Sequence, residues 1–175
     1  MQGVALSGAP PRFKMQLMPA ARRLFVSTTD SSHDAHDGIE IVDLDALASV
    51  GFAITEGSGH SDMGGFLMLD DDAGYYVFHT DLLASTHLQP FTISGGADPD
   101  PSPIVLLNDT VDMLAHDPLR RLLYLPAGFS GEHGLYALST VTHEPVGPPL
   151  FTGLPPHDVL VEQVAVPGFG GASLR

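Results

Sequence analysis

The sequence predicts an all-β fold made of repeated four-stranded sheets, and three observations lead to this prediction. Gly (19) and Pro (15) are abundant in a chain of 175 residues, as expected where many short elements are joined by tight turns. No stretch keeps a 3.6-residue apolar period for three turns without a Gly or Pro, which disfavours helices. Short apolar runs recur about every 50 residues, which indicates an internal repeat.

The repeat is clearest in three apolar runs that each follow a turn. Residues 22–26, 73–77 and 120–124 align with spacings of 51 and 47 residues. Residues that favour chain reversal precede these runs, such as the Asp70-Asp71-Asp72 run and Asp117-Pro118. Because another apolar stretch stands before each turn, the pattern predicts one hairpin per repeat.

Each repeat is expected to contain four strands, named A to D in chain order. The expected A strands are residues 13–18, 65–69 and 111–115, and the B strands are the three runs above. The expected C strands are residues 39–44, 87–93 and 135–138, and the D strands are 52–54, 104–107 and 150–152. Several strands are apolar on both faces, which favours sheets stacked between neighbouring sheets over a one-faced sandwich.

Stacked four-stranded sheets predict the blades of a β-propeller. We expect one domain over residues 1–175, with blades at about 13–56, 63–108 and 111–154, the start of a further blade at 157–166 and a tail at 167–175. Within the further blade, residues 159–163 fit strand A, and residues 4–6 fit strand D of a preceding blade. Closed propellers have about four to eight blades. We therefore expect a partial ring, completed by further blades of the same protein or by an oligomer.

Two segments of the first blade resemble a known repeat. Residues 24–28 (LFVST) followed by residues 38–45 (GIEIVDLD) resemble the YVTN repeat, in which a YVTN-like strand precedes a vsVID strand. The second blade keeps the Tyr76-Val77 pair. The third blade keeps the order and spacing of the two segments but not the residue types of the repeat. The resemblance covers roughly residues 13–163 and implies a propeller like those of bacterial surface or periplasmic proteins and of lactonase-type enzymes. It implies no particular reaction, since propellers carry many functions.

The charge of the chain excludes two classes of partner. Asp and Glu number 21 against seven Lys and Arg, which gives an acidic chain with a net charge of −14. Such a surface repels phosphate backbones and anionic lipids, so we expect neither nucleic acid nor acidic membranes as partners. Cations, sugars and basic or neutral partners stay open. No run of 18 apolar residues exists, so we expect no membrane insertion.

The compartment follows only from the resemblance. Residues 1–15 lack a basic region followed by an apolar run, so we expect no secretory signal within them. Either the protein is cytoplasmic or its start lies upstream, and the resemblance implies a periplasmic or extracellular protein whose signal peptide lies outside this chain. Cys is absent, which excludes disulfides, a thiolate nucleophile and a Cys-built zinc site.

The repeat register predicts a candidate ligand site at the channel mouth. Asp62, Asp112 and Asp158 each stand at the start of an expected A strand. Strand A is the innermost strand of a blade, so these carboxylates are expected to converge at one mouth of the central channel. Further donors stand near them in the sequence or on the corresponding loop: His60, His157 and Asn108.

These residue types suit a metal ion. Carboxylate and amide oxygens hold Ca²⁺, which takes about six to eight oxygen ligands. Asp62, Asp112 and Asp158 are therefore candidate ligands for Ca²⁺ or another divalent cation. The alternative is that they hydrogen-bond turn amides at the start of each strand. Lys14 stands at the corresponding place of the first blade, where it fits a pair with Asp62 or an anionic group.

A second group of metal-ligand types stands at residues 31–38. His33, His36 and Asp37 have side chains that suit zinc or copper. The segment bridges strands B and C and lacks an EF-hand pattern, so we favour a solvated loop that ends in an Asp-Gly turn.

We expect a noncatalytic binding or interaction propeller that holds a protein or small-molecule ligand at its loop face or channel mouth. The sequence has no G-x-S-x-G, P-loop, H-E-x-x-H or dinucleotide motif, so we name no catalytic residue. One alternative is a lactonase-like or other metal-assisted hydrolase, in which the cation polarises a carbonyl or activates water. Another is a structural fragment of a larger propeller.

Overall fold

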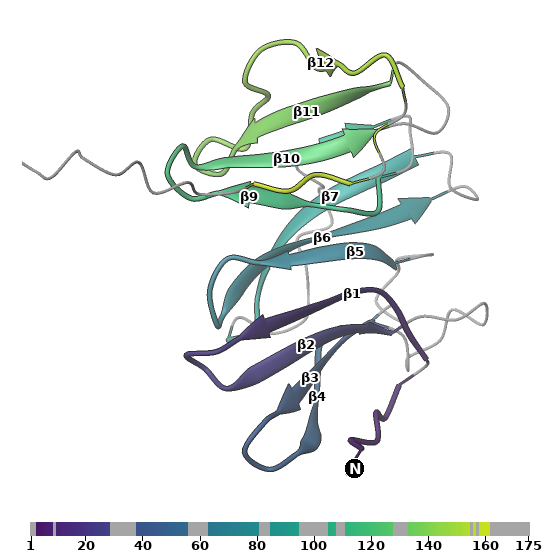
Figure 1. Cartoon of the computed structure of the whole chain (residues 1–175), viewed down its shortest axis with the longest axis vertical. Coiled ribbons are helices and arrows are strands. Elements are labelled where there is room, and N and C mark those ends of the chain that lie inside the picture. Colours follow the sequence, from purple (N-terminus) through teal and green to yellow (C-terminus); the bar gives the residue numbers. More distant parts are fainter. Residues whose placement is uncertain are drawn as a thin grey trace, which may run out of the picture.

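The computed structural model describes most of the chain (Figure 1). The described residues are 3–8, 10–28, 38–55, 63–80, 85–94, 105–107, 111–127, 133–154, 156 and 158–161. All regular structure in these ranges is β-strand, which confirms the prediction of an all-β fold. No helix able to cross a membrane occurs within these ranges.

Twelve strands in the described ranges form three antiparallel sheets of four strands each. Sheet 1 contains β1 (Pro11–Met18), β2 (Arg23–Thr28), β3 (Gly38–Asp43) and β4 (Ala48–Thr55). Sheet 2 contains β5 (Met63–Met68), β6 (Ala73–Thr80), β7 (Ser85–Thr92) and β8 (Val105–Leu107). Sheet 3 contains β9 (Ala115–Asp117), β10 (Leu122–Ala127), β11 (Gly134–Ser139) and β12 (Leu150–Phe151). Strands that follow each other in the chain are neighbours in the sheet.

The three expected groups of four strands are present, but two strand predictions are wrong. The first strand of sheet 3 is Ala115–Asp117 and not residues 111–115, because residues 111–114 pack on β5 instead of pairing within their own sheet. Of the strand expected over residues 159–163, the described residues 159–161 form no strand and the rest lies outside the described residues, so the start of a further blade at 157–166 stays a prediction. Residues 4–6 form no strand and belong to a segment that crosses sheet 1.

The three sheets repeat one backbone connection. In each, an N–H group just after the third strand donates to a carbonyl oxygen of the turn between the first two strands. The three bonds are Leu44 N to Arg22 O at 2.9 Å, Ile93 N to Asp72 O at 2.8 Å and Thr140 N to Arg121 O at 2.9 Å. The structural repeat therefore differs by one residue from the sequence alignment in the second and third sheets.

Side-chain oxygens hold four of the turns. Each accepts hydrogen bonds from the backbone N–H groups two and three residues ahead, as in Asx and Ser/Thr turns. The acceptors are Asp43, Asp70, Asp117 and Ser139. The predicted hairpin turn at the Asp70-Asp71-Asp72 run is thus confirmed.

Sheet 2 lies between the other two sheets, and its side chains pack on both (Figure 1). Successive residues of β6 point to opposite faces, as strand geometry requires. Tyr76 and Phe78 join an apolar cluster with residues of sheet 1, whereas Tyr75 and Val77 join a cluster with residues of sheet 3. Because each buried side chain of this size contributes about 1.5–3 kcal/mol, these two clusters hold the sheets together.

The N-terminal segment, residues 3–8, crosses the face of sheet 1 that points away from sheet 2. Glu40 on that face is fully buried, and its carboxylate accepts hydrogen bonds from the Ser7 backbone N–H at 2.7 Å, the Ser7 hydroxyl at 2.7 Å and the Gly8 N–H at 3.1 Å. Burial acts to raise the pKa of Glu40, but hydrogen bonds from Ser49, Ser7 and Gly8 outweigh it and hold the pKa below its ordinary value.

Candidate functional site

The described residues include only part of the predicted channel-mouth site. Asp112 and Asp158 are described, and so is Lys14. The other candidates lie outside the described residues, and their placement stays a prediction: Asp62, His60, His157, Asn108, His33, His36 and Asp37.

The Asp112 side chain contacts sheet 2. Its Oδ1 atom lies 2.9 Å from Nε2 of His79 on β6. The other ring nitrogen of His79 lies 3.1 Å from the Thr86 hydroxyl, which accepts a hydrogen bond from the Val111 N–H at 3.0 Å. Because the Thr86 oxygen accepts from Val111, its own proton can point to His79 Nδ1. This arrangement favours the His79 tautomer that donates from Nε2 to the Asp112 carboxylate.

This Asp112–His79–Thr86 chain has the same order of groups as a hydrolytic triad, but its exposure differs. His79 is 1% exposed and Thr86 is 0% exposed. A nucleophilic hydroxyl must reach a substrate carbonyl, and the Thr86 oxygen is buried and already bonded to Val111. The chain of contacts therefore fastens residues 111–112 to sheet 2 and presents no nucleophile.

Two glycines allow this close approach. A Cβ atom on Gly65 would lie 1.7 Å from the carbonyl oxygen of Asp112, and one on Gly64 would lie 2.9 Å from His79 Nε2. A side chain at either position would push the segment away from β5. The Gly64-Gly65 pair inside an apolar strand is the sequence signal for this contact.

A cavity of about 350 Å³ opens where the first strands of the sheets meet residues 158–161. We call it the inner-strand cavity. Figure 1 shows residues 158–161 running beside β9. The lining residues with polar or large apolar side chains include Lys14, Gln16, Leu67, His116, Asp158 and Leu160. Asp158 and Lys14, both placed at the channel mouth by the repeat register, thus line one cavity.

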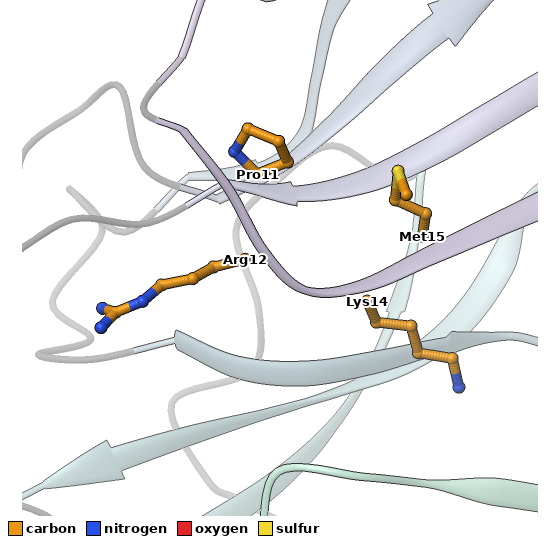
Figure 2. A pocket seen from close by; sticks show the side chains of 4 residues that line it. All are labelled: Pro11, Arg12, Lys14 and Met15. Atoms are coloured by element: carbon orange, nitrogen blue, oxygen red, sulfur yellow. The ribbon is translucent and has the colours of Figure 1, made fainter.

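Lys14 is the cation of this cavity. Its Nζ atom donates to the Leu114 carbonyl oxygen at 3.1 Å, which links β1 to the segment before β9. Burial lowers the pKa of Lys14, and the charge of Asp158 partly opposes this shift. The β1–β2 ladder is irregular between Pro11 and Met15, and Figure 2 shows Lys14 and Met15 leaving the strand in opposite directions. Lys14 also lines a second, open cavity of about 260 Å³ beside Pro11, Arg12 and Met15 (Figure 2).

Two further polar side chains shape the inner-strand cavity. The Gln16 side-chain amide makes two hydrogen bonds with the Met68 backbone. Its Nε2 donates to the Met68 carbonyl oxygen at 2.8 Å, and its Oε1 accepts from the Met68 N–H at 2.9 Å, so Gln16 joins β1 to β5. Burial lowers the pKa of His116 despite the opposing charge of Asp117, so its imidazole is neutral near pH 7. The described lining residues therefore offer one ammonium, one carboxylate and one neutral imidazole beside aliphatic side chains.

The described part of the chain contains no group of three or more His, Asp or Glu residues placed to hold a metal ion. The metal prediction also depends on Asp62, which lies outside that part, so it stays a prediction.

Comparisons with known proteins leave the family open. No family model matches the chain, and no curated protein or solved structure matches it. The likeness to the YVTN repeat therefore rests on the sequence, chiefly on residues 24–28 and 38–45 and on the Tyr76-Val77 pair.

Proposed function

We propose that the chain is a noncatalytic binding protein of the β-propeller type, with YVTN-like repeats, whose three sheets are blades around a shared axis. Three features support the arrangement. Each sheet is a four-stranded meander, sheet 2 packs on both neighbours, and the turn hydrogen bond recurs in all three sheets. The first strands of sheets 1 and 2 contact each other, as innermost strands of neighbouring blades do.

The inner-strand cavity is the proposed ligand site, and it carries the functional proposal. Its volume of about 350 Å³ falls in the range of about 300–1,000 Å³ typical of small-molecule sites. Lys14 and Asp158 offset each other's charge, and the chain as a whole repels anions. An uncharged ligand therefore fits better than an anion.

The chemistry of the lining favours a ligand rich in hydroxyl groups, such as a monosaccharide. The Asp158 carboxylate accepts hydrogen bonds from hydroxyls, the Lys14 ammonium donates them, and the neutral His116 imidazole does either. Leu67 and Leu160 supply apolar surface for the C–H face of a sugar ring.

A thermal-shift screen tests this proposal. The panel contains neutral mono- and disaccharides, with zwitterionic amino acids and inorganic phosphate as separate arms. We expect at least one sugar to raise the melting temperature, because a ligand that binds only the native state stabilises it. Asp158→Asn and Lys14→Met should abolish that rise, and Leu119→Ala, on the exposed turn between β9 and β10, should keep it.

Three results would contradict the proposal. Shifts with amino acids or phosphate but not with sugars would make the ligand class wrong. A sugar shift that survives both Asp158→Asn and Lys14→Met would place the ligand elsewhere. The lack of any shift across the panel would remove the small-ligand function.

A further inference from the structure

Lys14 is the only lysine of the chain, and it lines both cavities described above. The β1–β2 ladder is irregular between Pro11 and Met15, and such irregularities re-aim side chains, often beside functional sites. Figure 2 shows the Lys14 side chain pointing away from that of Arg12. Lys14 is thus the one cation among the described residues that line the inner-strand cavity.

The surroundings of the Lys14 Nζ atom favour loss of its proton. Nζ donates to the Leu114 carbonyl oxygen at 3.1 Å, and a carbonyl stabilises an ammonium less than a carboxylate does. Burial lowers the pKa of Lys14 by more than the charge of Asp158 raises it. At a given pH, a larger share of Lys14 is therefore the neutral amine than for a lysine in water, and the neutral amine is a nucleophile.

The hydrogen bond to Leu114 is compatible with the neutral amine. A neutral amine keeps two N–H groups and a lone pair, so one N–H bonds the carbonyl while the lone pair stays available to a ligand. His116 stands two residues after Leu114 and lines the same cavity. Burial lowers the pKa of His116, and its neutral imidazole can take a proton from the amine and return it.

We propose that Lys14 binds a small uncharged aldehyde or ketone as an imine in the inner-strand cavity, an inference that rests on this cavity being the ligand site proposed above. The open-chain form of an aldose belongs to this class. The neutral Nζ adds to the carbonyl carbon, and the two protons that the nitrogen loses leave with the carbonyl oxygen as water. A C=N bond remains, and nothing is oxidised or reduced. Water reverses the reaction and releases the ligand unchanged, as suits a binding protein.

The cavity suits such a ligand in size and charge. Its volume of about 350 Å³ admits a small carbonyl compound beside the Lys14 side chain. A protonated imine keeps one positive charge on the nitrogen, which the Asp158 carboxylate of the same cavity stabilises. The other titratable side chains among the described lining residues of the two cavities are His116, which is neutral near pH 7, and Arg12, which points away (Figure 2). Asp158 is therefore the charged group that acts on Lys14.

Reductive trapping on the intact chain tests the inference. The chain is incubated with glycolaldehyde and sodium cyanoborohydride, which reduces an imine to a stable secondary amine, and peptide mass spectrometry locates the adduct. Because Lys14 is the only lysine, the α-amino group is the one other primary amine that can react. We expect an adduct at Lys14 and its loss in Lys14→Arg, which keeps the positive charge and a donor for Leu114. An aldose should give the adduct as well, whereas its methyl glycoside, which cannot open to a free carbonyl, should give none.

Leu119→Lys supplies a matched reference amine. Leu119 is 79% exposed in the β9–β10 turn, so the new amine at this position is in water and circular dichroism should show the wild-type β spectrum. At pH 7 we expect faster trapping at Lys14 than at position 119, and a lower midpoint for its rise with pH. Asp158→Asn should lower that midpoint further, because the carboxylate that favours the ammonium is gone. In concentrated urea the two rates should become equal, since unfolding removes the burial.

Trapping at Lys14 that is no faster than at position 119 in the folded chain would overturn the inference and leave Lys14 as a structural link between β1 and Leu114. A faster rate at Lys14 that persists in urea would also overturn it, because the neighbouring sequence and not the cavity would then cause it. A midpoint that Asp158→Asn does not move would remove Asp158 from the site.

The sugar proposal and the imine can fail separately. If sugars raise the melting temperature but leave no adduct at Lys14, the imine is wrong and the sugar site stands. An adduct with glycolaldehyde but neither an adduct nor a melting-temperature rise with sugars would keep the imine, assign the cavity to small aldehydes and remove the sugar ligand.

Discussion

Nε2 of His79 lies 2.9 Å from Oδ1 of Asp112, although 33 residues separate them in the chain. The contact joins β6 to the segment that leads into β9. His79 is 1% exposed and the Asp112 side chain is 38% exposed, so loss of the carboxylate takes one hydrogen-bond partner from a buried ring nitrogen. The junction between sheets 2 and 3 therefore combines an apolar cluster with polar links, from Asp112 to His79 and from Val111 to Thr86.

Replacing the Asp112 carboxylate measures how much its contact with His79 contributes to the free energy of unfolding. We expect Asp112→Ala to lower the free energy of unfolding by about 1–3 kcal/mol, because the buried His79 loses its acceptor. Asp112→Asn should lower the free energy of unfolding by less, because the amide oxygen of Asn can still accept a hydrogen bond from His79. Urea denaturation measures both, with Asp71→Ala in the exposed β5–β6 turn as the control. Equal effects of Asp112→Ala and Asp71→Ala would show that the link contributes nothing.

The glycine pair of β5 gives a steric prediction. A methyl group at Gly65 would overlap the Asp112 carbonyl oxygen, which is backbone and must move as a unit. We expect Gly65→Ala to lower the free energy of unfolding by about 1–3 kcal/mol, the usual cost of overpacking. Gly3→Ala meets no atom within 4 Å and is the matched control. Similar melting temperatures for the two variants would mean that residues 111–114 do not lie on β5.

Glu40 predicts a pH dependence of stability. Its pKa in the folded chain lies below the ordinary value of 4.5, so the ionised carboxylate stabilises the fold above that value. The stabilisation disappears as the pH falls through the folded-state pKa. We expect Glu40→Gln to cost about 1–3 kcal/mol near pH 7 and much less well below pH 4. Urea denaturation across this pH series measures the difference, and a difference that grows on acidification would contradict the assignment.

Leu47 offers a stabilising substitution. It lies in the β3–β4 turn with a φ of 50°, a left-handed conformation that costs a residue with a side chain about 1 kcal/mol or more. Leu47 is 44% exposed, so little packing is lost on its removal. We expect Leu47→Gly to raise the melting temperature, while Ala48→Gly in β4 lowers it. The opposite order would show that the turn does not adopt this conformation.

The cation hypothesis has its own measurement. If the protein binds its ligand without a metal, adding Ca²⁺ or a chelator should leave the melting temperature unchanged. A stoichiometric cation in purified protein, lost in both Asp62→Asn and Asp158→Asn, would instead favour the metal-assisted hydrolase.

The strands of sheets 1 and 2 were predictable because their signals are local. Apolar runs and turn residues stand next to each other in the chain, and the Asx turns at Asp43 and Asp70 confirm this chemistry. The ladder of β9 was not predictable in the same way. Val111 and Leu114 look like strand residues, but contacts with β5 across the fold decide where pairing begins.

Only those residues of the candidate site that occupy equivalent positions in the repeat could be predicted from the sequence. The register placed Lys14 and Asp158 at equivalent positions, and both line the inner-strand cavity. It could not reveal His79 as the partner of Asp112, because no spacing rule links a residue on β6 to one before β9. His116 was also missed, since only the packing around it gives its neutral imidazole a place in the cavity.

The position of sheet 2 sets the order in which the molecule comes apart. Opening this sheet removes two apolar clusters at once, whereas opening an outer sheet removes one. Backbone amides of β6 should then exchange hydrogen with the solvent only through global unfolding, while those of the two-residue β12 exchange from the native state. The chain would therefore fray from both ends toward the middle, and its central third would be the last to lose protection.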